Sequence, residues 1–168
     1  MRIFRRPGSW EPPPPGLIKV NFDGACFEGG EEGGAGIIAH DSAGQTLAWC
    51  SIRIEKPVKL LLIEAIAVRE AAHLVAQKSW PNVIIEGDCE ILIKKLQSAK
   101  PDSSGIGPLI SDCFSLLGPV SSSFTFVRRT GNFAAHSLAK HATSFVEGLS
   151  SPPNYIHEIR LADFGPVL

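Results

Sequence analysis

The chain has no excess of positive charge, the usual sign of a protein whose overall electrostatic field attracts nucleic acid. Its 168 residues include 16 Lys and Arg against 17 Asp and Glu, so the formal net charge is −1. A nucleic-acid partner would therefore require a local basic patch or bound metal ions.

Closely spaced cysteines are also missing. Cys26, Cys50, Cys89 and Cys113 lie far apart and form no C-x-x-C motif, so neither a zinc site nor a redox motif is indicated. Unpaired cysteines of this kind are typical of intracellular proteins. We expect reduced thiols and a location in the nucleus or the cytoplasm.

Long apolar runs are absent as well. A helix that crosses a bilayer needs about 18–20 apolar residues, and Glu64 and Arg69 interrupt the longest candidate. The N-terminus is basic but leads into prolines rather than into the apolar core of a signal peptide. We therefore expect no membrane partner.

The remaining composition is that of a soluble globular domain, with 44% hydrophobic and 20% charged residues. Residues 1–16 form a proline-rich N-terminal extension that ends in Pro12-Pro-Pro-Pro-Gly16. We place one domain over residues 17–148 and a peripheral C-terminal tail over residues 149–168, and we expect a monomer.

The apolar patterns predict an α/β fold. Three strands with short connections, over residues 17–23, 36–39 and 46–54, predict an antiparallel meander. The alternation of helices and strands that follows predicts parallel pairing that joins the meander. The elements predicted in this second part are helices over residues 60–77, 90–97, 109–117 and 132–146 and strands over residues 82–88 and 122–128.

Three acidic residues stand at unusual places in these elements. Asp23 and Asp88 end predicted strands, and Glu64 falls near the middle of the apolar face of the long helix. Each has a simple alternative role. Asp23 precedes a glycine and suits a turn, Asp88 can cap the helix that follows, and Glu64 can interact with a helix dipole.

The predicted burial of Glu64 favours a metal site over these alternatives. A helix terminus contributes about 0.3–1 kcal/mol, whereas an unpaired buried carboxylate costs several kcal/mol or loses its charge. Three carboxylates within about 4 Å would repel by roughly 4 kcal/mol per pair at an effective dielectric near 20, so cations must accompany them. Oxygen ligands predict Mg²⁺ or Mn²⁺, and two such ions can promote phosphodiester hydrolysis.

Several short motifs occur in a specific order. They are Pro12-Pro-Pro-Pro-Gly16, Lys19-x-Asn21-x-Asp23-Gly-Ala25, Gly33-Gly-Ala-Gly36, Asp41-x-x-Gly44, Glu86-Gly-Asp88, Val127-Arg-Arg and Asn132-x-x-Ala135-His136-x-Leu-Ala139. This order, which covers about residues 10–147, resembles that of plant reverse-transcriptase-like domains of the ribonuclease H type.

The resemblance implies a ribonuclease H-like fold, in which helices flank a five-stranded mixed sheet. It implies an endonuclease that hydrolyses the RNA strand of RNA–DNA hybrids with Mg²⁺ or Mn²⁺, and two bound ions are expected. Carried over by motif, Asp23, Glu64 and Asp88 are metal ligands and catalytic residues. The hybrid would be recognised by its shape and its 2′-hydroxyls rather than by base edges.

The same resemblance supplies candidate contacts to nucleic acid. They are the backbone of Gly24, Ala25 and Cys26 and the side chains of Arg128, Arg129 and Asn132. The two arginines are equally typical of a solvated surface, and Asn132 can also cap the final helix.

The chain departs from the family pattern at two positions. His136 stands where the family has an aspartate as fourth metal ligand, and an imidazole supplies no negative charge. His136 is therefore either a catalytic ligand or a residue at the solvent edge. The family's loop histidine is replaced by Arg129-Thr-Gly131. These departures keep a second interpretation open, a catalytically weak or inactive nucleic-acid-binding or interaction module derived from a retroelement.

Overall fold

A computed structural model of the chain describes residues 8–56, 58–149 and 152–153. Residues 1–7, 57, 150–151 and 154–168, and with them most of the predicted tail, lie outside the described residues. The elements in the described part are β1 (Ile18–Cys26), β2 (Gly33–His40), β3 (Thr46–Ile54), α1 (Leu60–Lys78), β4 (Asn82–Gly87), α2 (Glu90–Ser98), α3 (Gly107–Leu116), β5 (Ser121–Phe126), the 3-10 turn η1 (Arg129–Gly131), α4 (Phe133–Lys140) and β6 (Phe145–Gly148).

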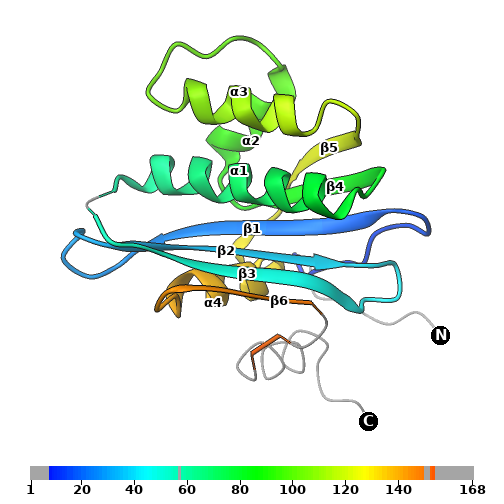
Figure 1. The fold of residues 1–168 in the computed structure, drawn as a ribbon, viewed down its shortest axis with the longest axis horizontal. Coiled ribbons are helices and arrows are strands. Elements are labelled where there is room, and N and C mark those ends of the chain that lie inside the picture. The colour runs from blue at the N-terminus through cyan, green and yellow to red at the C-terminus, as the bar shows by residue number, and fades with distance from the viewer. Residues whose placement is uncertain (1–7, 57, 150–151, 154–168) are drawn as a thin grey trace.

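The strands of the described part form one mixed sheet in the order β5-β4-β1-β2-β3-β6. β1, β2 and β3 make the antiparallel meander, and β4 and β5 continue the sheet in parallel with β1. Figure 1 shows α1, α2 and α3 on one face of the sheet and α4 on the other. The predicted meander and its parallel extension are confirmed.

The predicted final helix over residues 132–146 is wrong beyond Lys140, where α4 ends. Residues 145–148 instead form β6, which pairs with β3, so the sheet has one strand more than the five predicted. Phe145 is 61% exposed and Val146 is 41% exposed, so neither continues the buried face of α4. Aromatic and β-branched residues favour strands, although these two also fall at helical spacing.

The main core lies between α1 and the sheet. The apolar face predicted for α1 is buried, and Val20 and Phe22 of β1 are fully buried in the same core. Because side chains alternate along a strand, Asn21 and Asp23 point to the opposite face, where their side chains contact residues of the α4 segment. This alternation separates the apolar packing of β1 from its polar chemistry.

The helix α4 lies directly on β2 because β2 has glycines at the crossing. A Cβ atom on Gly36 would come within 2.2 Å of the carbonyl oxygen of Ala135, and one on Gly34 within 2.0 Å of that of Ala139. The glycines of the Gly33-Gly-Ala-Gly36 motif therefore fix α4, the helix that carries His136, close to the sheet.

Two helices end in a residue with a left-handed backbone that is not glycine. Ser79 follows α1 with φ 55°, and Ala99 follows α2 with φ 52°. Glycine is the usual residue at such a position because it has no Cβ atom.

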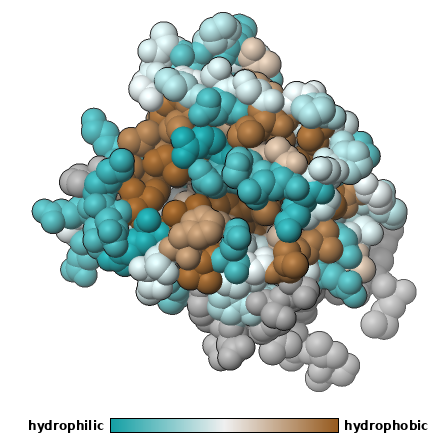
Figure 2. Space-filling view, in the orientation of Figure 1, coloured by the Kyte–Doolittle hydropathy of each residue, from teal (hydrophilic) through white to brown (hydrophobic). Residues whose placement is uncertain are grey.

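The surface combines polar and apolar residues. On the face shown in Figure 2, apolar areas are divided by polar side chains. None of the helices within the described ranges combines the length and the apolar character needed to cross a membrane. All four cysteines are free thiols.

Candidate metal centre

Three carboxylates from three elements meet beside the carboxyl end of β4. The parallel register pairs Asn21 with Glu86, so Asp23 and Asp88 lie level with each other two residues further along. Glu64 reaches the same place from α1. Each carboxylate offers an oxygen atom, and these oxygens lie within 4.8 Å of one another. The structure thus brings together the three residues that the sequence singles out.

Gly24 allows Glu64 to reach this place. A Cβ atom on Gly24 would lie 2.8 Å from the backbone nitrogen of Glu64 and 2.8 Å from the carbonyl carbon of Ile63, so a side chain here would push α1 away. Among the residues whose backbone is predicted to contact nucleic acid, Gly24 and Ala25 are buried and Cys26 is exposed. Gly24 therefore serves the packing of α1 against β1.

The alternative roles of the three acids do not occur. Asp23 lies within β1 rather than in a turn. Cys89, not Asp88, is the N-cap of α2, and no side chain makes a cap hydrogen bond there. The first turn of α1 contains no acidic residue, because Glu64 lies just beyond it.

Burial and crowding shift the protonation of the carboxylates. Burial, together with the charges of Asp23 and Asp88, raises the pKa of Glu64 to about 10. Burial and the charge of Asp23 also raise the pKa of Asp88, although Arg129 opposes this. Burial raises the pKa of Asp23 too, but the neighbouring donor His136 and the acids Glu64 and Asp88 outweigh it and hold that pKa below its usual value. Without a cation, Glu64 is therefore protonated at neutral pH while Asp23 keeps its charge.

Two basic side chains of the chain itself contact these carboxylates. Nδ1 of His136 lies 2.6 Å from Oδ2 of Asp23, and Nε of Arg129 donates to Oδ2 of Asp88. Nη1 of Arg129 lies 3.3 Å from Nε2 of His136. Because a guanidinium only donates, Nε2 accepts and Nδ1 carries the proton that Asp23 receives as a hydrogen bond. His136 therefore belongs to the site rather than to the solvent edge.

The remaining carboxylate oxygens fit a divalent cation. One oxygen of each acid is buried without a hydrogen-bond partner among the described residues, namely Asp23 Oδ1, Glu64 Oε2 and Asp88 Oδ1. Buried acceptors without partners are unfavourable, and a hard cation such as Mg²⁺ or Mn²⁺ takes carboxylate oxygens as ligands. The three acids are thus suited to hold one such ion between them.

Asn132 lies behind the site and not on its surface. Its side chain is buried, its Nδ2 donates to the carbonyl oxygen of Phe22 at 2.9 Å, and its Oδ1 accepts from Nδ2 of Asn21 at 3.0 Å. It occupies the N-cap position of α4 but makes no side-chain cap hydrogen bond. This position does not support the predicted contact of Asn132 with nucleic acid. Arg128 and Arg129, by contrast, are exposed.

A cluster of three polar side chains that the sequence does not predict also lies here. Nδ2 of Asn21 donates to Oε1 of Glu86 at 3.1 Å, and Oε2 of Glu86 lies 3.3 Å from Nζ of Lys19. All three side chains are buried. In the sequence, this cluster is indicated by the polar positions of β1, where Lys19 and Asn21 alternate with apolar residues and precede Asp23.

Comparison with known families gives one match. A family model described as reverse transcriptase-like matches residues 21–142. A comparison with curated proteins finds no match.

Solved structures with a similar fold include several ribonucleases H. RNase H1 from the halophilic archaeon Halobacterium salinarum NRC-1 has a TM-score of 0.69 and 22% identity, over 75% of this chain and 96% of its own. The N-terminal RNase H domain of Rv2228c from Mycobacterium tuberculosis has a TM-score of 0.69 and 14% identity, over 75% of this chain and 92% of its own. LC11-RNase H1, solved in complex with an RNA/DNA hybrid, has a TM-score of 0.67 and 17% identity, over 74% and 95%. The predicted ribonuclease H-like fold is confirmed.

Proposed function

The chain belongs to the reverse transcriptase-like family and has a ribonuclease H-like fold, and from this premise we propose that it is a metal-dependent endonuclease that hydrolyses the RNA strand of RNA–DNA hybrids. The observation that carries the proposal is the convergence of Asp23, Glu64 and Asp88, each with one unpartnered buried oxygen. The hybrid complex of LC11-RNase H1 supports nucleic acid as the partner.

The three acids would hold Mg²⁺ or Mn²⁺, which when bound activates a water and stabilises the leaving oxygen. Glu64 has to give up its proton to become a ligand, because its pKa is about 10 in the metal-free site. His136 fixes Oδ2 of Asp23 through a hydrogen bond and leaves Oδ1 for the ion. The side chain of Arg129 is 53% exposed at the same place and is positioned to pair with a phosphate of the substrate.

The products of this reaction would carry a 5′-phosphate and a 3′-hydroxyl. Recognition of the RNA strand would rest on its 2′-hydroxyls and on the shape of the hybrid. The three carboxylate oxygens without a hydrogen-bond partner provide ligands for one ion. The second ion that the family resemblance implies would have to displace Arg129 from Asp88 or His136 from Asp23.

One observation favours a second candidate function. Arg129 already pairs its charge with one oxygen of Asp88, and His136 donates a hydrogen bond to one oxygen of Asp23, which lowers the need of the site for cations. A domain in this condition would bind nucleic acid and cleave it slowly or not at all. This is the catalytically weak module, derived from a retroelement, that the departures in the sequence suggest.

Cleavage of a labelled RNA–DNA hybrid in Mg²⁺ and in Mn²⁺ separates the two candidates. We expect cleavage by the wild type in at least one metal. Asp23→Asn and Asp88→Asn should each lower the rate by more than about 100-fold, because loss of a group that only supports a metal ligand already costs about 10–100-fold. Asp112→Asn, a change at an exposed acid of α3, is the matched control. Binding of the hybrid without cleavage in either metal would reject the enzyme and favour the module.

A further inference from the structure

Residues 8–11, here named the N-terminal brace, contact the protein beside the metal centre. They precede the family match, which begins at residue 21. The brace and its neighbours share three hydrogen bonds, from Trp10 Nε1 to Asn21 Oδ1 (3.0 Å), from Lys19 Nζ to Glu11 O (2.7 Å) and from Thr130 Oγ1 to Gly8 O (2.8 Å).

The brace approaches η1 at backbone distance. A Cβ atom on Gly131 would lie 2.9 Å from the carbonyl oxygen of Gly8, and a Cβ atom on Gly8 would lie 2.9 Å from Oγ1 of Thr130. Gly8 also has φ +87°, which disfavours any other residue. The two glycines therefore place the brace directly against the turn that begins with Arg129.

The ring of Trp10 contacts two side chains. Its centroid lies 4.8 Å from that of His40, and Nζ of Lys19 lies 5.7 Å from the Trp10 centroid. A ring held in this way keeps its N–H directed at Asn21.

Asn21 connects the brace to the site. Its Nδ2 donates to Glu86 and to Asn132, and its Oδ1 accepts from Trp10, so every hydrogen of the amide is used. Asn21 is 2% exposed and Asn132 is 1% exposed. Without the indole N–H, a buried carbonyl oxygen in the middle of this network would lose its partner.

Asn132 carries the connection on to the catalytic residues. Its side chain donates to the carbonyl oxygen of Phe22, the residue before Asp23. Its own carbonyl oxygen accepts from the backbone nitrogen of His136 at 3.0 Å, the first hydrogen bond of α4. The brace is thus linked both to the strand that carries Asp23 and to the segment that carries Arg129 and His136.

We propose that the N-terminal brace supports the geometry of the metal centre and that Trp10 is a positioning residue. Through Asn21 and Asn132, Trp10 fixes Arg129 and His136 relative to the carboxylates. The effect of Trp10 on metal binding and cleavage rests on the proposed function, whereas its effect on the order of residues 129–136 does not.

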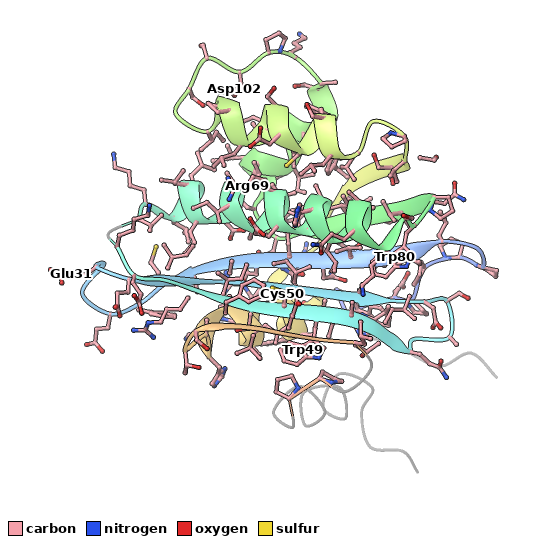
Figure 3. The ribbon with its side chains drawn as sticks, viewed as in Figure 1. Glu31, Trp49, Cys50, Arg69, Trp80 and Asp102 are labelled. Carbon is pink, nitrogen blue, oxygen red and sulfur yellow. The ribbon has the colours of Figure 1, made fainter. Side chains whose placement is uncertain are left out.

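Trp10→Phe in the full chain tests this role. The substitution keeps an aromatic ring beside His40 and Lys19 and removes the N–H that Asn21 accepts. Trp80→Phe is the matched control, since Trp80 lies two residues beyond the end of α1 (Figure 3) and packs against the main core. Both variants exchange an indole for a phenyl ring at a half-buried position.

In the metal-free protein, Trp10→Phe should accelerate amide hydrogen exchange of residues 129–136 about tenfold, because a buried acceptor loses its donor. Trp80→Phe should leave this exchange unchanged. The dissociation constant of Mn²⁺ should rise by a similar factor in Trp10→Phe, and kcat for the hybrid should fall while KM stays constant.

Unchanged exchange of residues 129–136 in Trp10→Phe would overturn the inference, and so would an equal acceleration in Trp80→Phe. If the wild type does not cleave the hybrid, the proposed function fails. The exchange comparison still decides the inference in that case, because it needs neither metal nor substrate.

Discussion

The imidazole of His136 forms hydrogen bonds to two charged residues of the metal centre. Nδ1 donates to Asp23, and Nε2 accepts from Arg129. A carboxylate at position 136 would attract Arg129. It would also repel the carboxylate of Asp23 unless a cation lay between the two acids. His136 therefore removes from the site the negative charge that a second divalent ion would need.

Replacement of His136 by aspartate should restore that charge. We expect His136→Asp to raise the rate of hybrid cleavage in Mg²⁺ by about tenfold and to lower the melting temperature of the metal-free protein, because a fourth acid adds repulsion. Single-turnover cleavage and thermal unfolding in a chelator measure the two effects. His136→Asn, which is similar in size but uncharged, is the control. Equal rates for the two variants would contradict the charge argument.

The protonation of Glu64 gives the metal-free protein a characteristic pH dependence. Burial and the nearby Asp23 and Asp88 raise its pKa from 4.5 to about 10, so the folded protein keeps a proton that the unfolded chain releases. The free energy of unfolding should therefore fall as the pH rises between these two values, by at most about 1.4 kcal/mol per pH unit.

Glu64→Gln should abolish this contribution. In urea unfolding with a chelator present, the variant and the wild type should be about equally stable near pH 4, and the variant should be the more stable near pH 8. Saturating Mg²⁺ should favour the wild type, because an amide is a weaker ligand than a carboxylate. Parallel stability curves for the two proteins from pH 4 to pH 8 would show that Glu64 is ionised in the folded state.

The sequence predicts the three acids but not their partners. Glu64 is recognisable because it interrupts an apolar helix face, and Asp23 because it ends a polar alternation. The partners depend on long-range geometry, since Asn21 bonds residues 65 and 111 positions away. Arg129 has the pattern of an ordinary exposed arginine, and only the turn η1 brings it to Asp88.

Among the elements, the crossing of α4 over β2 depends on glycine. A Cβ atom on Gly36 would lie 2.2 Å from the carbonyl oxygen of Ala135, so Gly36→Ala should force the helix away from the sheet. We expect a loss of about 1–3 kcal/mol in the free energy of unfolding, measured by urea unfolding. Gly105→Ala is the control and should leave the free energy of unfolding unchanged, because an added Cβ atom there would meet nothing within 4 Å. A neutral Gly36→Ala would show that α4 can move at little cost.

The extent of each element is predicted well where periodicity is clear and poorly where tertiary pairing decides. α1 and β3 have nearly the predicted bounds because apolar residues recur along them at a clear spacing. β2 begins at Gly33, earlier than predicted, since glycines lower strand propensity in isolation. β6 is missed because Phe145 and Val146 suit a helix by spacing, and only the neighbouring β3 makes them a strand.

For the whole molecule, the net charge of −1 limits how strongly the chain can attract a hybrid. Arg128 and Arg129 are exposed, and Arg129 contacts Asp88. With about two phosphates neutralised, the logarithm of the binding constant should fall with the logarithm of salt concentration with a slope of roughly −2. Fluorescence anisotropy with Asp88→Asn, which prevents cleavage, measures this slope.

Arg128→Gln should make the slope shallower by about 1. Lys78→Gln, a change at an exposed residue at the far end of α1, should leave it unchanged. A wild-type slope steeper than about −5 would point to a larger basic surface than these two arginines provide.

The residues with a left-handed backbone after α1 and α2 affect how many destabilising mutations this chain can tolerate. Ser79 and Ala99 each keep a side chain at a backbone conformation that costs roughly 1–2 kcal/mol. Both lie at the helix ends opposite those that flank Glu64 and Asp88. A change to glycine at either position would return part of that free energy and compensate for destabilising changes elsewhere. Mutations that alter the metal centre can therefore accumulate in a lineage of this chain without loss of the fold.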